Sequence, residues 1–201
     1  MKFEPPHPLA PIRGGVLIGG DSSRMGRPKW SLEYEGKSLL ERAVDVLRTI
    51  DARPTILGGE PEMTGFDLPH LPDLPGAEGP LAGVSAAMRE DEDAAWLILA
   101  CDLPYFGIDA MQWILSQRKP DAWAVMPRAL GRLQPLGALY EPRAGTLVLG
   151  QMRTRDFAAH HLATRAGCWT PTAPSSLERA WTNVNTPEEW AKVSPDGPHH
   201  E

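Results

Sequence analysis

Apolar positions along this chain form short continuous runs and stripes with helical spacing, with loops rich in proline and glycine between them. Continuous runs predict short buried strands at residues 13–18 and 55–57. The run at 96–101 is apolar throughout, which is typical of a central parallel strand covered on both faces. Two later segments, 122–127 and 136–140, predict further strands, the second of them after a turn.

Helical periodicity occupies the segments between and after these strands. Ser38 can cap the first helix, and Glu41 stands three residues later, which is the capping-box spacing. Thr186 and Glu189 repeat this spacing near the end of the chain, with Pro187 at the first helical position. Helices are predicted at residues 38–50, 80–90, 109–117, 144–152, 156–165 and 187–193.

Strands and helices therefore alternate along much of the chain. This order predicts an α/β fold with three layers, in which helices cover both faces of a mostly parallel sheet. We expect residues 13–193 to form a single domain. Residues 1–12 are expected to be a flexible N-terminal segment and residues 194–201 a flexible tail.

Composition narrows the class of protein. A length of 201 residues and a hydrophobic content of 42% are ordinary for a soluble globular protein with one domain or at most two. The formal net charge of -6 argues against a nucleic-acid-binding protein, which usually carries a basic face. The negative net charge is compatible with a single nucleotide as ligand, because the charge of the binding site, and not that of the whole chain, decides whether a nucleotide binds.

Cysteine usage and hydropathy bear on the compartment. Cys101 and Cys168 lie far apart without a CxxC pattern, so a reducing compartment is the simpler interpretation. The N-terminal stretch MKFEPPHPLAP lacks the apolar segment of a secretory signal, and no apolar run approaches the ~20 residues that span a bilayer. We therefore expect a cytoplasmic protein that binds neither a membrane nor nucleic acid.

Three features are predicted to lie at the carboxyl ends of the parallel strands, where open α/β sheets bind ligands. Gly19 and Gly20 follow the first strand, Asp102 ends the long apolar run, and Gly79 precedes a predicted helix. Their convergence on one edge indicates a ligand site more strongly than any of them alone.

The first of these features is the stretch VLIGGDSSRMGRPK, in which Arg24 and Lys29 follow the glycine turn. Such a turn lets backbone N–H groups face phosphate oxygens, and the two cations add positive charge. A tight turn with two exposed cations explains the same residues. The stretch matches neither the GxxxxGK[ST] phosphate loop nor the GxGxxG dinucleotide pattern.

The remaining candidates are carboxylates and amides that also have simpler structural explanations. Asp102 is suited to Mg²⁺, which prefers oxygen ligands and keeps waters and substrate phosphates in its shell, but it can equally belong to a turn. Asp73, in a proline-rich loop, can form an Asx turn. Asn183 and Asn185 can be turn residues before the last helix.

Taken together, these segments resemble a known family. VLIGGDSSRMGRPK is similar to the LAGGxSxRMGxxK signature of nucleotidyltransferases that act on molybdopterin and on sugar or alcohol phosphates. GPLAGVSAAM, LACDLPY, RLQPLGALY and NVNTPEEW, in this order, narrow the resemblance to the molybdenum cofactor guanylyltransferases. The resemblance extends over about residues 15–193.

This resemblance implies a Rossmann-like nucleotidyltransferase domain with Mg²⁺ as cofactor. The implied reaction joins GMP from GTP to molybdopterin, expected to be loaded with molybdate, and releases pyrophosphate. GTP and molybdopterin are the implied partners, together with transient contact with molybdopterin-loading proteins or recipient molybdoenzymes.

The resemblance also assigns residues to roles. Arg24 and Lys29 are expected to hold the triphosphate, Asp102 to carry Mg²⁺, and Asn183 and Asn185 to lie on the molybdopterin side. The catalytic set is Arg24, Lys29 and Asp102. The nucleotide-binding set is Leu17, Ile18, Gly19, Gly20, Lys29, Asp73, Gly79 and Asp102.

Two departures from the family pattern bear on the choice of base. Ile18 stands where the family has alanine, and residues 57–60 read LGGE where members often have an asparagine. A CTP-dependent molybdopterin cytidylyltransferase and a sugar-phosphate nucleotidyltransferase are therefore alternatives. A non-enzymatic nucleotide or molybdopterin carrier is another, which the presence of both Lys29 and Asp102 disfavours.

Overall fold

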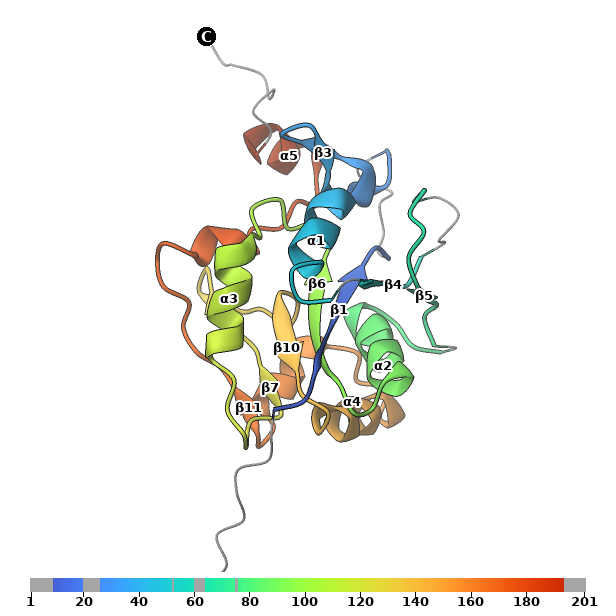
Figure 1. Ribbon diagram of the computed structural model, residues 1–201, viewed down its shortest axis with the longest axis vertical. Helices are drawn as coiled ribbons and strands as arrows, with labels where there is room; N and C mark the ends of the chain where they lie inside the picture. Colours follow the sequence, from blue (N-terminus) through green and yellow to red (C-terminus); the bar gives the residue numbers. More distant parts are fainter. Residues whose placement is uncertain (1–8, 20–25, 52, 60–63, 75, 194–201) are drawn as a thin grey trace, which may run out of the picture.

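A seven-stranded sheet runs through the centre of the computed structural model, which describes residues 9–19, 26–51, 53–59, 64–74 and 76–193 (Figure 1). From edge to edge its strands are β11 (Cys168–Trp169), β7 (Ala124–Val125), β10 (Ala138–Tyr140), β6 (Ala95–Ala100), β1 (Ile12–Leu17), β4 (Thr55–Leu57) and β5 (His70–Leu71). Only β10 runs antiparallel to its neighbours, β6 and β7, and the other pairings in this sheet are parallel. The prediction of a mostly parallel sheet is confirmed.

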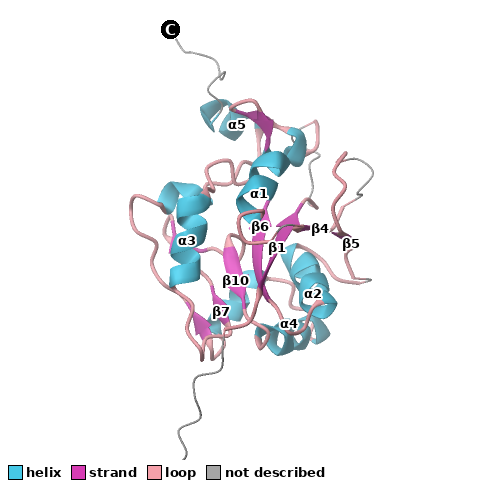
Figure 2. Cartoon of the chain, in the orientation of Figure 1, coloured by secondary structure: helices cyan, strands magenta, loops and turns pink. Residues whose placement is uncertain are grey.

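Helices cover both faces of this sheet and complete three layers (Figure 2). One face carries α1 (Leu39–Leu47), α3 (Ile108–Ser116) and the 3-10 helix η5 (Glu178–Trp181). The other carries α2 (Pro80–Glu90), α4 (Ala144–Arg153) and the 3-10 helix η4 (Ala159–Thr164). The predicted three-layer α/β fold is therefore confirmed.

The remaining elements lie outside these layers. They are η2 (Lys29–Ser31), the hairpin of β2 (Glu33–Tyr34) and β3 (Lys37–Ser38), the hairpin of β8 (Arg128–Ala129) and β9 (Arg132–Leu133), and α5 (Pro187–Val193). Trp190 of α5 packs on a small cluster that contains Tyr34 and Leu39. Within the described ranges, no helix is both long and apolar enough to cross a membrane.

Side-chain alternation along β6 explains why its sequence is apolar throughout. Leu97 and Leu99 face the layer of α1 and α3, whereas Trp96 and Ile98 face the layer of α2 and α4. None of these four side chains is more than 1% exposed. Because successive side chains of a strand point to opposite faces, a strand buried on both sides has no place for a polar residue.

The α1 helix begins with the predicted capping box. Ser38 Oγ accepts a hydrogen bond from the Glu41 N–H at 3.1 Å, and the Glu41 carboxylate accepts one from the Ser38 N–H at 2.6 Å. The hydrogen bonds from Ser38 lower the pKa of the Glu41 carboxyl. Leu40, Val44 and Leu47 then form the buried stripe, so local capping and periodicity agree on this helix.

Some predicted elements need correction. In the segment predicted as a helix at 156–165, only Ala159–Thr164 is helical, and it is a 3-10 helix. The Asp156 carboxylate accepts from the Ala158 N–H at 3.3 Å, a local turn that competes with the first turn of an α-helix. In addition, β1 begins at Ile12, inside the segment expected to be flexible, and the Pro11 carbonyl accepts from the Ala95 N–H at 2.8 Å.

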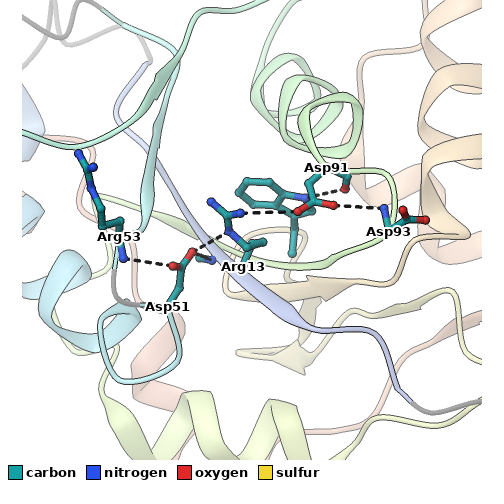
Figure 3. A network of polar contacts seen from close by, with 7 residues as sticks. Arg13, Asp51, Arg53, Asp91 and Asp93 are labelled. Atoms are coloured by element: carbon teal, nitrogen blue, oxygen red, sulfur yellow. Dashed lines mark hydrogen bonds and ion pairs between the residues drawn. The ribbon is translucent and has the colours of Figure 1, made fainter.

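A polar network ties the start of β1 to the ends of two helices on opposite faces (Figure 3). Asp51, just after α1, accepts from Arg13 Nε at 3.1 Å, from the Gly14 N–H at 3.0 Å and from the Arg53 N–H at 3.1 Å. The same Arg13 guanidinium reaches Asp91, the C-terminal cap of α2, at 3.6 Å. The Asp51 side chain is only 12% exposed, so these bonds are partly shielded from water.

We predict that Asp51→Ala destabilises the fold by about 2 kcal/mol, because the partly buried Gly14 N–H loses its acceptor. Urea denaturation followed by circular dichroism measures this change. Asp121→Ala is the matched control, since Asp121 is exposed and its side chain has no hydrogen bond or ion pair among the described residues. Equal stability of the two variants would contradict the structural role of Asp51.

Candidate active site

Four polar residues from distant parts of the chain meet at the carboxyl ends of β1 and β6. Lys29 begins η2, Asp102 follows β6, and Asn183 and Asn185 precede α5. Lys29 Nζ lies 3.2 Å from Asp102 Oδ2 and 2.7 Å from Asn185 Oδ1. Asn183 Nδ2 donates to Asp102 Oδ1 at 3.1 Å. The fold thus brings together four of the residues that the sequence singles out.

The Lys29–Asp102 ion pair is largely withdrawn from water, since each side chain is 14% exposed. Both carboxylate oxygens of Asp102 are engaged, one by the Lys29 ammonium and the other by the Asn183 amide. Loss of one partner would leave the other charge poorly compensated in a shielded place. The pair therefore keeps two opposite charges in a defined position.

The segment around Val184 is anchored by its backbone. Val184 is fully buried, and its N–H donates to the Asp102 carbonyl at 3.1 Å. Thr186 Oγ1 accepts from the Glu189 N–H at 3.2 Å, as predicted for a cap of α5. The Glu189 carboxylate, however, accepts from the Asn185 N–H at 2.6 Å, which fixes the residue that holds Lys29.

A cavity of about 340 Å³ opens beside this group. Its lining includes most of the predicted site residues: Leu17, Ile18, Gly19, Lys29, Asp73, Gly79, Asp102 and Asn183. Asn185 does not line the cavity, but it accepts a hydrogen bond from Lys29, which does. The predicted residues Gly20 and Arg24 lie outside the described residues.

Leu136 and Cys101 also line this cavity but were not among the residues assigned from the sequence. Leu136 lies within RLQPLGALY, a stretch that carries the resemblance but offers no polar side chain at this position. The Cys101 thiol is buried, which raises its pKa well above the ordinary value and makes it an unreactive part of the wall.

Asp73 lies against the glycine backbone that ends β1 and β4. A Cβ atom placed on Gly58 would approach Asp73 Oδ1 to 3.0 Å, and one on Gly19 would approach Asp73 Oδ2 to 3.8 Å. Burial raises the pKa of the Asp73 carboxyl, although nearby His70 opposes the shift. Asp73 cannot form the Asx turn that the sequence allowed as an alternative. The residue two positions later is Pro75, which has no backbone N–H to donate to the Asp73 carboxylate. A carboxylate with a raised pKa in a cavity is typical of a functional site.

The large side chain of Ile18 occupies space that is free because residue 59 is a glycine. A Cβ atom on Gly59 would approach Ile18 Cγ1 to 2.9 Å, which is closer than real contacts allow. Gly59 also has a φ of 66°, a backbone conformation that favours glycine. The Ile18 side chain is 8% exposed and packs in the core, so its extra bulk fills the space that Gly59 leaves.

The arrangement of carboxylates limits how a metal ion can bind. Among the described residues, no group of three or more histidine, cysteine, aspartate or glutamate side chains is placed to hold one. Two carboxylates, those of Asp73 and Asp102, line the cavity. This donor set fits Mg²⁺, which is commonly held by one or two carboxylates together with substrate phosphates and water.

Comparison with known proteins shows the family to which the chain belongs. A family model for the MobA-like NTP transferase domain matches residues 14–165, a span that contains Lys29, Asp73, Asp102 and most of β1. The chain belongs to the MobA-like NTP transferase family. It is therefore a nucleotidyltransferase enzyme, and the resemblance on which the sequence prediction rests is confirmed.

Relatives of this MobA-like transferase match nearly its whole length. Molybdenum cofactor guanylyltransferase of Xanthomonas euvesicatoria pv. vesicatoria is 30% identical over 94% of this chain and 97% of its own. The crystal structure of molybdopterin-guanine dinucleotide biosynthesis protein A from Archaeoglobus fulgidus has a TM-score of 0.77 at 18% identity, covering 90% of this chain and 96% of its own. A Mycobacterium tuberculosis protein, whose crystal structure is a complex with manganese, has a TM-score of 0.63 at 16% identity over 92% and 98% of the two chains.

We predict that Gly59→Ala destabilises this MobA-like transferase more than Gly65→Ala does. Both glycines have positive φ, which costs an alanine about 1–2 kcal/mol, but an added Cβ meets nothing within 4 Å at Gly65 and meets Ile18 at Gly59. In an Ile18→Ala background, the effect of Gly59→Ala should shrink by about 1 kcal/mol. Urea denaturation of the wild type, the two single variants Ile18→Ala and Gly59→Ala, and the double variant measures the coupling, and additive effects would exclude it.

Proposed function

We propose that this MobA-like transferase transfers GMP from GTP to molybdopterin, forming the guanine dinucleotide cofactor and releasing pyrophosphate. The observation that carries the proposal is the shielded Lys29–Asp102 pair at the wall of the cavity. It supplies a cation for phosphate and a carboxylate for a divalent metal within 3.2 Å of each other. The Xanthomonas relative, which matches nearly the full length, bears the name of the same activity.

In this proposal the substrates occupy opposite sides of the Lys29–Asp102 pair. The nucleoside lies against Leu17, Ile18, Gly19 and Asp73, and the triphosphate lies toward Lys29. Arg24 is assigned to the triphosphate by the sequence resemblance. Molybdopterin approaches from the side of Asn183, so that its phosphate meets the α-phosphate of GTP.

The reaction needs placement and charge neutralisation rather than a protein nucleophile. An oxygen of the molybdopterin phosphate bonds to the α-phosphorus of GTP, and the bond from that phosphorus to the bridging oxygen of the β-phosphate breaks. Pyrophosphate leaves with the electron pair of that bond. Lys29 offsets the repulsion between the two anionic substrates and the charge that develops on the leaving group.

Asp102 would hold the divalent metal, which we propose to be Mg²⁺. The metal supplies charge neutralisation for the phosphates when bound. Asn183 holds one Asp102 oxygen and thereby orients the carboxylate, and Asn185 gives Lys29 an acceptor that does not depend on Asp102.

We predict that the purified protein uses GTP in preference to CTP. With molybdopterin and Mg²⁺ present, kcat/KM for GTP should exceed that for CTP by more than about tenfold, or 1.4 kcal/mol. Pyrophosphate release coupled to a colorimetric phosphate assay measures both rates. Equal rates, or a preference for CTP, would contradict the proposed base, and the absence of turnover with any nucleotide would favour a carrier.

We predict that Asp102→Asn lowers kcat for pyrophosphate release by about 10²–10³-fold while the fold survives. Asparagine keeps the shape of the side chain and can still accept a hydrogen bond from Lys29, but it loses the negative charge that a metal requires. Pyrophosphate release measures activity, and a cooperative thermal transition shows that the variant is folded. Near wild-type turnover in a folded Asp102→Asn protein would show that Asp102 is not the metal ligand.

A further inference from the structure

A second cavity, of about 430 Å³, adjoins the cavity described above. The two share Leu136 and Asn183 in their linings. Arg128 and Arg132 of the β8–β9 hairpin line the second cavity, and His160 lines it from η4. No aspartate or glutamate belongs to its described lining, although the whole chain has a formal charge of -6. The cavity is therefore a local positive site in an acidic protein.

The charges of these two arginines are not neutralised within the described ranges. The Arg128 side chain makes no hydrogen bond or ion pair there, and Arg132 makes one hydrogen bond, from Nη2 to Asn183 Oδ1 at 3.1 Å. A third cavity, of about 660 Å³, differs because two of its cations are already paired with Glu35 and Asp45. Available guanidinium groups in a cavity favour an anionic ligand.

The hairpin that carries the arginines is held firmly by buried contacts. Ala129 is 1% exposed, and its carbonyl accepts from Gln134 Nε2 at 2.9 Å. The Arg128 N–H donates to the Pro171 carbonyl at 2.9 Å, and the Arg128 carbonyl accepts from the Ala173 N–H at 2.9 Å. The backbone of the hairpin is thus positioned before a ligand binds, because its hydrogen bonds to Pro171 and Ala173, which do not line the cavity, hold it in place.

Asn183 connects the second cavity to the Lys29–Asp102 pair. Its amide oxygen accepts from Arg132, and its amide nitrogen donates to Asp102. A ligand in the second cavity therefore lies one residue away from the carboxylate that faces the nucleotide. This position suits a second substrate whose phosphate attacks the α-phosphorus of GTP beside Asp102 while the rest of the molecule extends away.

We propose that the cavity lined by Arg128, Arg132 and His160 holds the distal end of the acceptor. The inference rests on the proposed function, in which the acceptor is molybdopterin. The dithiolene sulfurs of that molecule, with or without molybdate, are anionic, and they lie away from the phosphate that reacts. Arg128 and Arg132 neutralise this charge, so they determine affinity for the acceptor rather than for the nucleotide.

Arg128→Gln tests the proposal most cleanly, because Arg128 has no side-chain contact to lose among the described residues. We expect KM for molybdopterin to rise about tenfold in Arg128→Gln, consistent with loss of one hydrogen bond to a charged group. The double variant Arg128→Gln/Arg132→Gln should show a rise of about a hundredfold. In Arg128→Gln, which leaves the hydrogen bond from Arg132 to Asn183 in place, the dissociation constant of GTP measured by calorimetry should stay within about twofold of the wild-type value.

Two further measurements separate a binding role from a structural one. Retention of molybdopterin through rapid gel filtration, without GTP, should fall in the variants although no reaction takes place. In the wild type, KM for molybdopterin should rise with ionic strength, and this dependence should be weaker in Arg128→Gln. Arg89→Gln/Arg143→Gln is the matched control, since it removes two exposed charges outside the linings of both cavities.

Each outcome has a distinct meaning. Wild-type turnover with unchanged KM and unchanged retention in both arginine variants would overturn the inference and leave the proposed function intact. An equal loss of GTP affinity in Arg128→Gln would assign the cavity to the nucleotide and would also overturn it. Absence of pyrophosphate release by the wild type would overturn the proposed function, and with it the assignment of molybdopterin as the acceptor in this cavity.

Discussion

The parallel pairing of β1 with β6 is the contact on which the site depends. The strands are in register from Ile12 opposite Ala95 to Leu17 opposite Ala100, and the Cys101 N–H donates to the Leu17 carbonyl at 3.0 Å. Because both strands end at the same edge, Gly19 after β1 and the Asp102 carboxylate after β6 line the same cavity. The segment that carries Asn183 and Asn185 attaches to this edge through the backbone carbonyl of Asp102, which accepts a hydrogen bond from the Val184 N–H.

The charges of Lys29 and Asp102 balance each other in the structure without a substrate. In the proposed reaction, an acidic protein brings together two phosphate-bearing molecules, and the Asp102 carboxylate lies at the point where they meet. Lys29 balances Asp102, while the two asparagines hold the pair without adding charge. Neutral amides suit this place, because a further carboxylate would repel phosphate and a further cation would compete with a metal.

The elements that can be predicted from the sequence are those whose pattern lies within one short segment of the chain. β6 follows from one continuous apolar run, and α1 follows from its cap and stripe. Motifs single out Asp102, Asn183 and Asn185, but the hydrogen bonds from Asn183 to Asp102 and from Lys29 to Asn185 depend on the whole fold. The fit of Ile18 against Gly59 and the hydrogen bond from Arg132 to Asn183 join residues far apart in sequence, so no local pattern predicts them. Two-residue strands such as β5 and β11 are too short to show any period.

Asn183 has a consequence beyond positioning, because its one amide group contacts both Arg132 and Asp102. An anion that draws Arg132 away frees the amide oxygen and changes the polarity of the amide that donates to Asp102. Occupancy of either cavity then alters the free energy of filling the other. Thermodynamic linkage makes this heterotropic effect reciprocal, so the factor by which a bound acceptor changes the affinity for the nucleotide equals the factor by which the nucleotide changes the affinity for the acceptor.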